Sequence, residues 1–349
     1  MWKVGTAYGS MGVALAWKLY HAEEVYDIDT GHDRWGKLVE GSQSQRLPSA
    51  YPATPPSQLR YTFDRTKLQL PLSARPIVLT FDEETRNWVE YYLRHPRGPI
   101  HSLALTVLGL FGYDQRDGEA ILDEPAVHLL SQKQWATILE NPHQGPSFQD
   151  SARAEMSTNL PLDLPTFAGR VLDVGAGSGH ITAAFAPLFE EAHSVEISPK
   201  LAWRLSEKNL NGLCSTKITA QVLEDNNRPT SFRMVFALNL LDRVDEGDKF
   251  LSNLIDIVEE NGHLVVALPL PFCAKRWKKE DGDQLEGPLH VEGTSWEEAA
   301  SNVAGLLQDR GLEVQTVTRA PYLCQGTWPG ETLLALDAAL FVARKKNAK

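Results

Sequence analysis

The sequence predicts an α/β protein whose sheet is mainly parallel and is covered by helices on both faces. From Arg170 onward, short β-branched and apolar runs alternate with stretches of helical periodicity. Strands that alternate with helices form parallel sheets. Where the first of these runs ends, glycines occupy every second position from Gly175 to Gly179, which is typical of a tight turn from a strand into a helix. Upstream of this half, the periodicity predicts a mainly helical accessory region.

The composition is that of an ordinary globular protein and excludes several function classes. Hydrophobic residues make up 42% of the 349 residues and charged residues 23%. The net charge of −11 argues against a dedicated nucleic-acid binder, which would carry a basic face. No run of 18 apolar residues is present, so we expect no membrane span. The 3 cysteines are too few and too scattered for a disulfide framework or a zinc site, and we expect no metal.

The first residues carry a weak resemblance to a targeting peptide. Lys3 precedes a mildly apolar stretch, and Ala14-Leu15-Ala16 has the form of a cleavage site. Interspersed glycines dilute the hydrophobicity of this stretch, so we favour a chain without such a peptide. We expect an intracellular protein, cytoplasmic by default, with the endoplasmic reticulum and the mitochondrion as alternatives.

Three regions follow one another along the chain. Six prolines between Pro48 and Pro76 predict irregular, extended backbone over 30–76. Helices are predicted over Phe81–Leu93 and Ile100–Phe111, and we expect the second to be buried or packed on another domain because it is almost entirely apolar. A capping box at Ser131 opens a third helix through Leu139. The predicted regions are an N-terminal segment with a Pro-rich arm (1–76), a helical accessory region (77–150) and a catalytic domain (151–349).

The catalytic half is predicted element by element from the same periodicity. The strands are expected at Val171–Gly175, His193–Ile197, Lys217–Val222, Arg233–Leu238, His263–Leu268, Glu313–Thr318 and Leu333–Val342. The helices are expected from the glycines to Phe189, over Pro199–Leu210 and Lys249–Glu259, and after a cap at Ser295 with Glu298 in the box position.

The glycine-rich turn carries the strongest chemical signal. Asp173, Gly175, Gly177 and Gly179 form a D-x-G-x-G-x-G pattern, and the N–H groups of the following helix would face a ligand. Dinucleotide folds instead place the third glycine three residues after the second. The pattern here resembles the first motif of class I S-adenosylmethionine methyltransferases. That resemblance implies a Rossmann-like seven-stranded sheet with S-adenosylmethionine as the cofactor and S-adenosylhomocysteine as its product.

Two acidic residues are candidates for the nucleoside end of that cofactor. Glu196 ends the second predicted strand, 23 residues after Asp173, where a carboxylate can accept hydrogen bonds from both ribose hydroxyls. Asp225, in a polar turn further on, is a weaker candidate for the adenine amino group.

The loop after Arg233–Leu238 should border the acceptor, because it leaves the carboxyl edge of the sheet. It contains a polar cluster of Asn239, Asp242 and Arg243 among leucines. It lacks the [ND]-P-P-[YFW] tetrapeptide of methyltransferases that act on adenine or glutamine amines, and no cysteine lies near it for thiolate chemistry.

Several ordered motifs give a more specific resemblance. The segments that carry it are LDVGAG at Leu172–Gly177, NLLDR at Asn239–Arg243, LPLPF at Leu268–Phe272, SWEE at Ser295–Glu298 and TRAPYLCQG at Thr318–Gly326. Together they resemble the DREV methyltransferase family, over about Ser131 to Val342. The resemblance implies methyl transfer to the pros nitrogen of histidine in His-x-His motifs of protein substrates.

The resemblance also assigns roles to residues. It implies that Glu196, Asn239 and Tyr322 contact the cofactor, and that Asn239, Asp242 and Tyr322 border the substrate imidazole, with Arg243 beside them. Neutral imidazole has a lone pair at pH 7, so we expect no strong general base. We expect Asp242 to accept the N–H of the ring and to stabilise the methylated cation.

Two departures from the family pattern bear on different properties, the first on cofactor binding, which we expect to be kept, and the second on peptide preference. Ser178 and His180 stand where the family's GAGDGE motif has acids, but the glycine backbone is intact. After LPLPF the family has proline and tyrosine, whereas this chain has Cys273–Trp277, which bears on peptide preference.

Two alternatives stay open at this point. One is a methyltransferase that acts on a small molecule or RNA, and the other is a regulatory protein that binds the cofactor without turnover. We favour the histidine-specific methyltransferase over both alternatives. We expect its partners to be His-x-His proteins or peptides and not nucleic acid, and we expect it to act as a monomer.

Overall fold

The structure is a computed structural model that describes residues 61–79, 82–94, 99–110, 118, 121–122, 127–140, 167–274, 285–325 and 333–346. The upstream elements are β1 (Arg75–Pro76), α3 (Glu83–Arg94), α4 (Pro99–Leu110), β2 (Val127–His128) and α6 (Gln132–Glu140). The Pro-rich arm before Tyr61 and the insertion over 275–284 lie outside the described residues.

The catalytic half contains the remaining elements. They are β3 (Phe167–Val174), α8 (His180–Phe185), the short 3-10 helix η2 (Ala186–Leu188), β4 (Phe189–Glu196), α9 (Pro199–Glu207), β5 (Gly212–Cys214), α10 (Ala220–Asp225), β6 (Phe232–Leu238), α11 (Gly247–Asp256), β7 (Val258–Pro269), α12 (Trp296–Asp309), β8 (Leu312–Gln325) and β9 (Leu333–Lys345).

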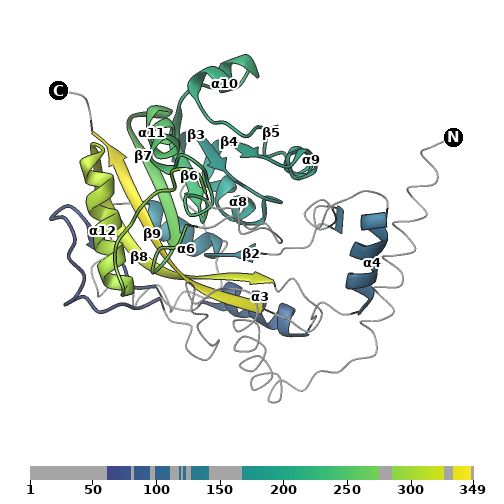
Figure 1. Cartoon of the computed structure of the whole chain (residues 1–349), viewed down its shortest axis with the longest axis horizontal. Helices are drawn as coiled ribbons and strands as arrows, with labels where there is room; N and C mark the ends of the chain where they lie inside the picture. The colour runs from purple at the N-terminus through teal and green to yellow at the C-terminus, as the bar shows by residue number, and fades with distance from the viewer. Residues whose placement is uncertain are drawn as a thin grey trace.

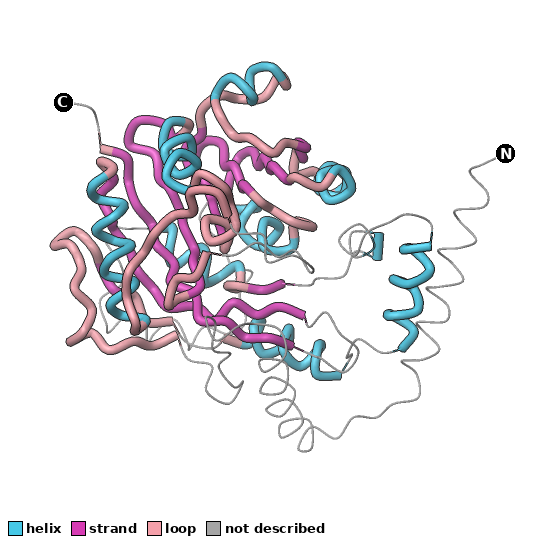
Figure 2. The backbone as a smooth tube through the Cα atoms, in the orientation of Figure 1, coloured by secondary structure: helices cyan, strands magenta, loops and turns pink. Residues whose placement is uncertain are grey.

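These strands form one twisted sheet with the order β1-β8-β9-β7-β6-β3-β4-β5, and β2 also pairs with β8 (Figures 1 and 2). The adjacent strands β7, β6, β3, β4 and β5 are parallel to one another, and β9 runs antiparallel to both β7 and β8. The predicted α/β fold with a seven-stranded Rossmann-like sheet is confirmed. The two short upstream strands extend the β8 edge, which makes a nine-stranded sheet in the described residues.

The two faces of the sheet carry separate apolar cores. On one face, α11 and α12 pack their leucines and alanines on alternate residues of the central strands, such as Leu172 and Val235. On the other face, α6 and α8 cover the intervening residues, including Val171 and Phe236. This alternation of partners along each strand is what a sheet buried on both faces requires.

The parallel strands bring the loops after β3, β4 and β6 to one carboxyl edge of the sheet. After β3, the backbone turns so that the N–H of Gly175 donates to the carbonyl of Val195 at 2.8 Å. After β6, the N–H of Asn239 donates to the carbonyl of Ala267 at 2.8 Å. Each loop is therefore anchored to a neighbouring strand as it leaves the sheet.

The expected helix caps are present. Ser131 and Gln134 form the reciprocal capping box of α6, because Ser131 Oγ accepts from the N–H of Gln134 at 3.2 Å and Gln134 Oε1 accepts from the N–H of Ser131 at 3.1 Å. At α12, Ser295 Oγ accepts from the N–H of Glu298 at 3.2 Å.

One predicted strand is misplaced, and three predicted helices end before the residues expected. Two of these helices are α9, which ends at Glu207 instead of Leu210, and α11, which ends at Asp256 instead of Glu259. The strand expected over Lys217–Val222 is a loop that leads into α10, because Thr219 caps that helix by accepting from the N–H of Val222 at 3.2 Å. The strand itself is the three-residue β5, which stands earlier. The helix expected to reach Phe189 ends at Phe185, and Phe189 already begins β4.

Burial of the apolar helix expected over Ile100–Phe111 is not seen along its whole length. In α4, Ala104 is buried, but Leu103 is 61% exposed, Val107 41% and Leu110 82%. Within the described part of the chain, none of the helices has the length and apolar character needed to cross a bilayer.

Candidate functional site

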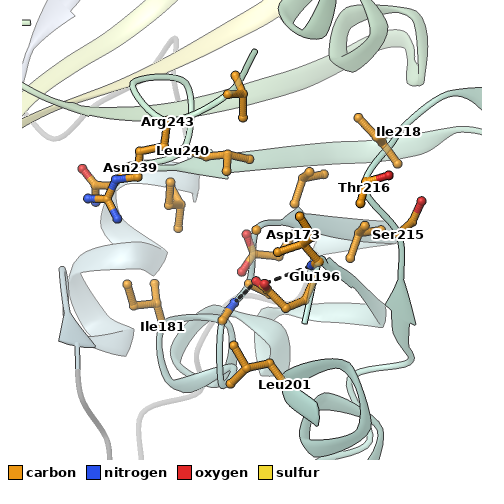
Figure 3. A pocket seen from close by; sticks show the side chains of 18 of the residues that line it. Asp173, Ile181, Glu196, Leu201, Ser215, Thr216, Ile218, Asn239, Leu240 and Arg243 are labelled. Carbon is orange, nitrogen blue, oxygen red and sulfur yellow. Dashed lines mark hydrogen bonds between the residues drawn. The ribbon is translucent and has the colours of Figure 1, made fainter. Parts of the chain in front are cut away.

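A cavity of about 420 Å³ opens at the carboxyl edge of the sheet. Its walls come from the glycine turn after β3, the end of β4, the segment Ser215–Ile218 after β5, and the loop after β6, with Val127 and Tyr322 closing one side. Figure 3 shows Asn239 and Arg243 together on one side, Ser215–Ile218 on the other, and Asp173 and Glu196 between them.

The glycine turn is a cradle that tolerates side chains poorly. Gly175, Gly177 and Gly179 have φ of 76°, 57° and 80°, in the left-handed region that favours glycine. A Cβ on Gly177 would meet nothing within 4 Å, so this residue presents bare backbone to the cavity. Gly179 does not line the cavity, and a Cβ there would lie 2.7 Å from Leu205. The third glycine therefore serves close packing of α8 on α9.

Glu196 is held by backbone donors at the end of β4. Its Oε2 accepts from the N–H of Gly177 at 2.9 Å, and its Oε1 accepts from the N–H of Ile197 at 2.9 Å (Figure 3). These bonds fix the carboxylate beside the glycine turn and against the cavity. The placement fits the role of a ribose acceptor.

Asp173 lies beneath the glycine turn and is buried. Its Oδ2 accepts from the hydroxyl of Thr182 at 2.5 Å. Burial raises the pKa of Asp173 from 3.8 to about 7; the Thr182 hydrogen bond opposes this rise in pKa, and the charge of Glu196 adds to it. Asp173 therefore titrates near neutral pH in the unliganded protein.

Asn239 presents an unused amide to the cavity. Its backbone is in the left-handed region with φ of 52°, a conformation that Asn adopts more readily than most residues. The side chain is only 4% exposed, and neither Oδ1 nor Nδ2 has a hydrogen-bond partner among the described residues. A buried amide without partners is energetically costly, which makes Asn239 a candidate for contact with a bound molecule.

Arg243, Asp242 and Tyr322 meet beside Asn239. Arg243 Nε donates to Asp242 Oδ2 at 3.3 Å, and Arg243 and Tyr322 line the cavity. Asp242 is 2% exposed and lies behind that wall rather than in it. Burial raises the pKa of the Tyr322 hydroxyl, while the charge of Arg243 and a hydrogen bond from it oppose the rise.

The structure thus brings together most of the residues singled out in the sequence, from four segments far apart along the chain. Asp225 does not join them, because it ends α10, accepts from Gln221 Nε2 at 2.8 Å and is exposed. Sequence reasoning missed Val127 and Ser215–Ile218. The second set would have followed from placing the third strand at Gly212–Cys214, whereas the two-residue β2 leaves no periodic signal.

No metal centre is evident in the described residues, where no group of three or more His, Cys, Asp or Glu side chains is placed to hold an ion.

The family model of the DREV methyltransferases matches residues 80–345. The chain belongs to this family. It is an S-adenosylmethionine-dependent methyltransferase with the class I α/β fold, and the glycine cradle, Glu196 and the unused Asn239 amide fit that cofactor.

More distant similarities accompany the family match. The mitochondrial ubiquinone biosynthesis O-methyltransferase of Schizosaccharomyces pombe is 28% identical over 125 residues, which are 34% of this chain and 44% of that enzyme. The chain thus spans less than half the length of that relative. Solved structures similar to this chain include magnesium protoporphyrin IX methyltransferase from Synechocystis (13% identity, 62% of this chain and 83% of that chain covered, TM-score 0.34). Another is a methyltransferase from Clostridium acetobutylicum (10% identity, 62% and 93%, TM-score 0.37).

Proposed function

We propose that this methyltransferase modifies the pros nitrogen of histidine in His-x-His segments of protein substrates. The observation that carries the proposal is the polar end of the cavity, where the unused amide of Asn239 lies beside the Arg243–Asp242 pair and Tyr322. Membership of the DREV family supports this substrate class, because the sequence motifs that resemble the family imply methylation of histidine in His-x-His segments.

The acceptor end suits an aromatic nitrogen nucleophile. A neutral imidazole offers one nitrogen with a lone pair and one N–H, so it needs both a donor and an acceptor around it. The Asn239 amide provides both, and the hydroxyl of Tyr322 lies on the same wall. Because imidazole is largely neutral at pH 7, the site has to orient the ring rather than remove a proton from it first.

The bound cofactor supplies a methyl group on a sulfonium, a strong electrophile that needs no metal. Glu196 and the backbone of Gly177 hold the nucleoside side of the pocket, and Asn239 with Tyr322 orient the accepting ring. The cofactor would supply the methyl group, and the residues at the polar end of the cavity would hold the ring so that the lone pair of its nitrogen is directed toward that group. Asn239 Oδ1 accepts the remaining N–H, and Asp242, which lies behind the cavity wall, stabilises the ring cation through its negative charge until that proton is lost to solvent.

The direct test incubates the protein with labelled S-adenosylmethionine and either Ala-His-Ala-His or Ala-Ala-Ala-Ala peptide, followed by amino-acid analysis of the methylated ring position. We expect label on the histidine peptide alone, at the pros nitrogen. An unlabelled histidine peptide, or label at the other nitrogen, would contradict the proposal.

A variant separates chemistry from cofactor binding. Asp242→Ala should abolish turnover and change the dissociation constant for the cofactor by less than about threefold. Asp248→Asn is the control, because Asp248 pairs with Arg310 and does not line the cavity. Full activity of Asp242→Ala would exclude the role given to that carboxylate.

A further inference from the structure

The side chain of Lys208 reaches the glycine turn from the end of α9. Its Nζ donates to the carbonyl oxygen of Ser178 at 2.8 Å and lies 3.3 Å from Nε2 of His180. An ammonium group has donors and no acceptor, so His180 takes part in the second contact as a neutral ring that accepts through Nε2. Ser178 lines the cavity and Lys208 does not. Lys208 therefore contacts the cavity wall without lining the cavity itself.

The backbone at the end of α9 fixes the place from which this lysine starts. Asn209 follows Lys208 with φ of 58°, in the left-handed region that Asn tolerates. The N–H of Asn209 donates to the carbonyl of Ser206 at 3.1 Å, and the N–H of Leu210 donates to the carbonyl of Leu205 at 2.9 Å. These two bonds form a Schellman motif, which closes the last turn of a helix. The Cα of Lys208 is thus held at a defined place beside the glycine turn.

Gly179 lets the end of α9 come close enough for this contact. A Cβ at Gly179 would lie 2.7 Å from Leu205 Cδ2 and 2.8 Å from Leu210 Cδ1. The same Cβ would lie 3.8 Å from Cδ of Lys208, so the lysine stem passes next to this glycine. A side chain at Gly179 would push the end of α9 away. The third glycine of the pattern is therefore necessary for the approach of Lys208.

The contact acts on a segment with little conformational preference of its own. Glycines adopt many backbone conformations at similar cost, so contacts from outside the turn decide which one it takes. One such contact is that of Glu196, which accepts from the N–H of Gly177 at 2.9 Å. Lys208 binds the Ser178 carbonyl, while the N–H of the same peptide group donates to the carbonyl of Ala176 at 2.9 Å. The turn is thus held by a carboxylate and by an ammonium group, whose hydrogen bonds are stronger than those of neutral groups.

We infer that Lys208 is a positioning residue for the cofactor, which holds the glycine turn in the conformation that receives S-adenosylmethionine before the ligand arrives. The inference concerns the cofactor and not the acceptor, so it does not rest on the proposed function. When only a fraction of a protein has the conformation that binds, its apparent affinity is reduced by that fraction. Loss of the bond from Lys208 should therefore weaken cofactor binding, although no residue that lines the cavity has changed.

The experiment compares the wild type with K208M, K208R and the control K249M. K208M keeps an unbranched stem beside Gly179 and loses the donor, whereas K208R keeps a charged donor. Lys249 donates to Glu246 Oε2 at 2.9 Å and does not line the cavity, so K249M loses a similar hydrogen bond elsewhere. Calorimetry measures the dissociation constant for S-adenosylhomocysteine. Hydrogen exchange follows the amides of the glycine turn in the empty protein, and urea unfolding gives the stability.

K208M should bind S-adenosylhomocysteine at least about tenfold more weakly than the wild type does, because a charge-assisted hydrogen bond no longer selects the conformation of the turn. In the empty K208M protein, the N–H groups of Gly177 and Gly179 should exchange at least about fivefold faster than in the wild type. Saturation with S-adenosylhomocysteine should remove most of that difference. K208R should recover most of the affinity and of the protection, and K249M should match the wild type in both.

Wild-type affinity and wild-type exchange rates in K208M would overturn the inference. So would a K208M protein that loses unfolding free energy alone, since Lys208 would then stabilise the fold without shaping the turn. A K208R protein as weak as K208M would also contradict it, because a charged donor at this position would not be what the turn requires. None of these measurements uses a peptide. A histidine peptide that is never methylated would therefore refute the proposed function and leave the role of Lys208 standing.

Discussion

Asn239 combines two demands that can be separated by substitution. Its backbone is in the left-handed region, and its buried amide has no hydrogen-bond partner among the described residues. Asn239→Gly removes the amide but suits the backbone, whereas Asn239→Ala removes the amide and strains the backbone by about 1–2 kcal/mol.

We therefore expect both Asn239 variants to weaken cofactor or acceptor-peptide binding by about tenfold, which corresponds to the loss of one or two hydrogen bonds. The free energy of unfolding of Asn239→Ala should be lower than that of Asn239→Gly by about 1 kcal/mol or more. Calorimetry and urea unfolding measure the two effects. Wild-type affinities in Asn239→Gly would show that the buried amide does not face a ligand.

Asp173 makes stability depend on pH. Its folded-state pKa is about 7, against an ordinary value of 3.8, because burial disfavours the charge. Between those two pH values the folded protein keeps a proton that the unfolded chain has released. The contribution of Asp173 to the free energy of unfolding therefore falls as pH rises through this window.

Asp173→Asn removes that titration and leaves an oxygen for the Thr182 hydroxyl. We expect the unfolding free energies of wild type and variant to be closest near pH 4. Between pH 4 and about pH 7, the unfolding free energy of the wild type should fall steadily relative to that of the variant. Urea unfolding at several pH values gives the difference. A difference that stays constant across this range would contradict a raised pKa.

At this scale the sequence identifies the residues of the site better than their arrangement. Asp173, Glu196 and Asn239 are found from their positions at strand ends, since carboxyl ends of parallel strands share one edge. That Asp242 lies behind Arg243 rather than in the cavity wall could not be predicted, because it depends on the turn back to Leu240 and on Tyr322 of a distant strand.

Ser131 joins two helices through one hydroxyl. It caps α6 by accepting from the N–H of Gln134, and it donates to the carboxylate of Asp82, which itself accepts from the N–H of Thr85 at the start of α3. Both helix starts thus share a hydrogen-bond network next to β2, whose Val127 lines the cavity.

Ser131→Ala should therefore cost more than the loss of a single cap. We expect about 2–3 kcal/mol of unfolding free energy, because a partly buried carboxylate also loses a partner. Ser295→Ala, which removes the cap of α12 alone, is the matched control and should cost about 1 kcal/mol. Equal losses in urea unfolding would mean that the bond to Asp82 adds nothing.

Elements are predictable where local signals agree with packing. The caps at Ser131 and Ser295 and the long buried strands follow from the sequence alone. The segment Lys217–Val222 has β-branched residues but folds as a cap and helix, because Thr219 satisfies the helix start locally. In helix α4 the composition alone is misleading. Its apolar residues predict burial, yet Leu103, Val107 and Leu110 are exposed.

On the scale of the whole molecule, the upstream region and the methyltransferase sheet share one core. Trp135 of α6 is fully buried, and its ring lies 5.4 Å from that of Phe185 in α8 and 5.6 Å from that of Phe236 in β6. The short strands β1 and β2 pair with β8 and extend the same sheet. The predicted boundary near residue 150 is thus crossed by an apolar core and by sheet hydrogen bonds.

Such a shared core should make the two regions unfold as one cooperative unit. Native-state hydrogen exchange should give α6 and β6 the same free energy of opening, and S-adenosylhomocysteine should raise both by the same amount, because a ligand stabilises the whole unit that it requires to be folded. Trp135→Ala should lower the free energies of opening of α6 and β6 by about 3–5 kcal/mol. The control Trp203→Ala truncates a half-exposed ring on α9 and should change each of these free energies by less than about 0.5 kcal/mol. Loss of protection in α6 alone would instead show an accessory region that opens independently, and the wall that Val127 contributes to the cavity would then be mobile relative to the sheet.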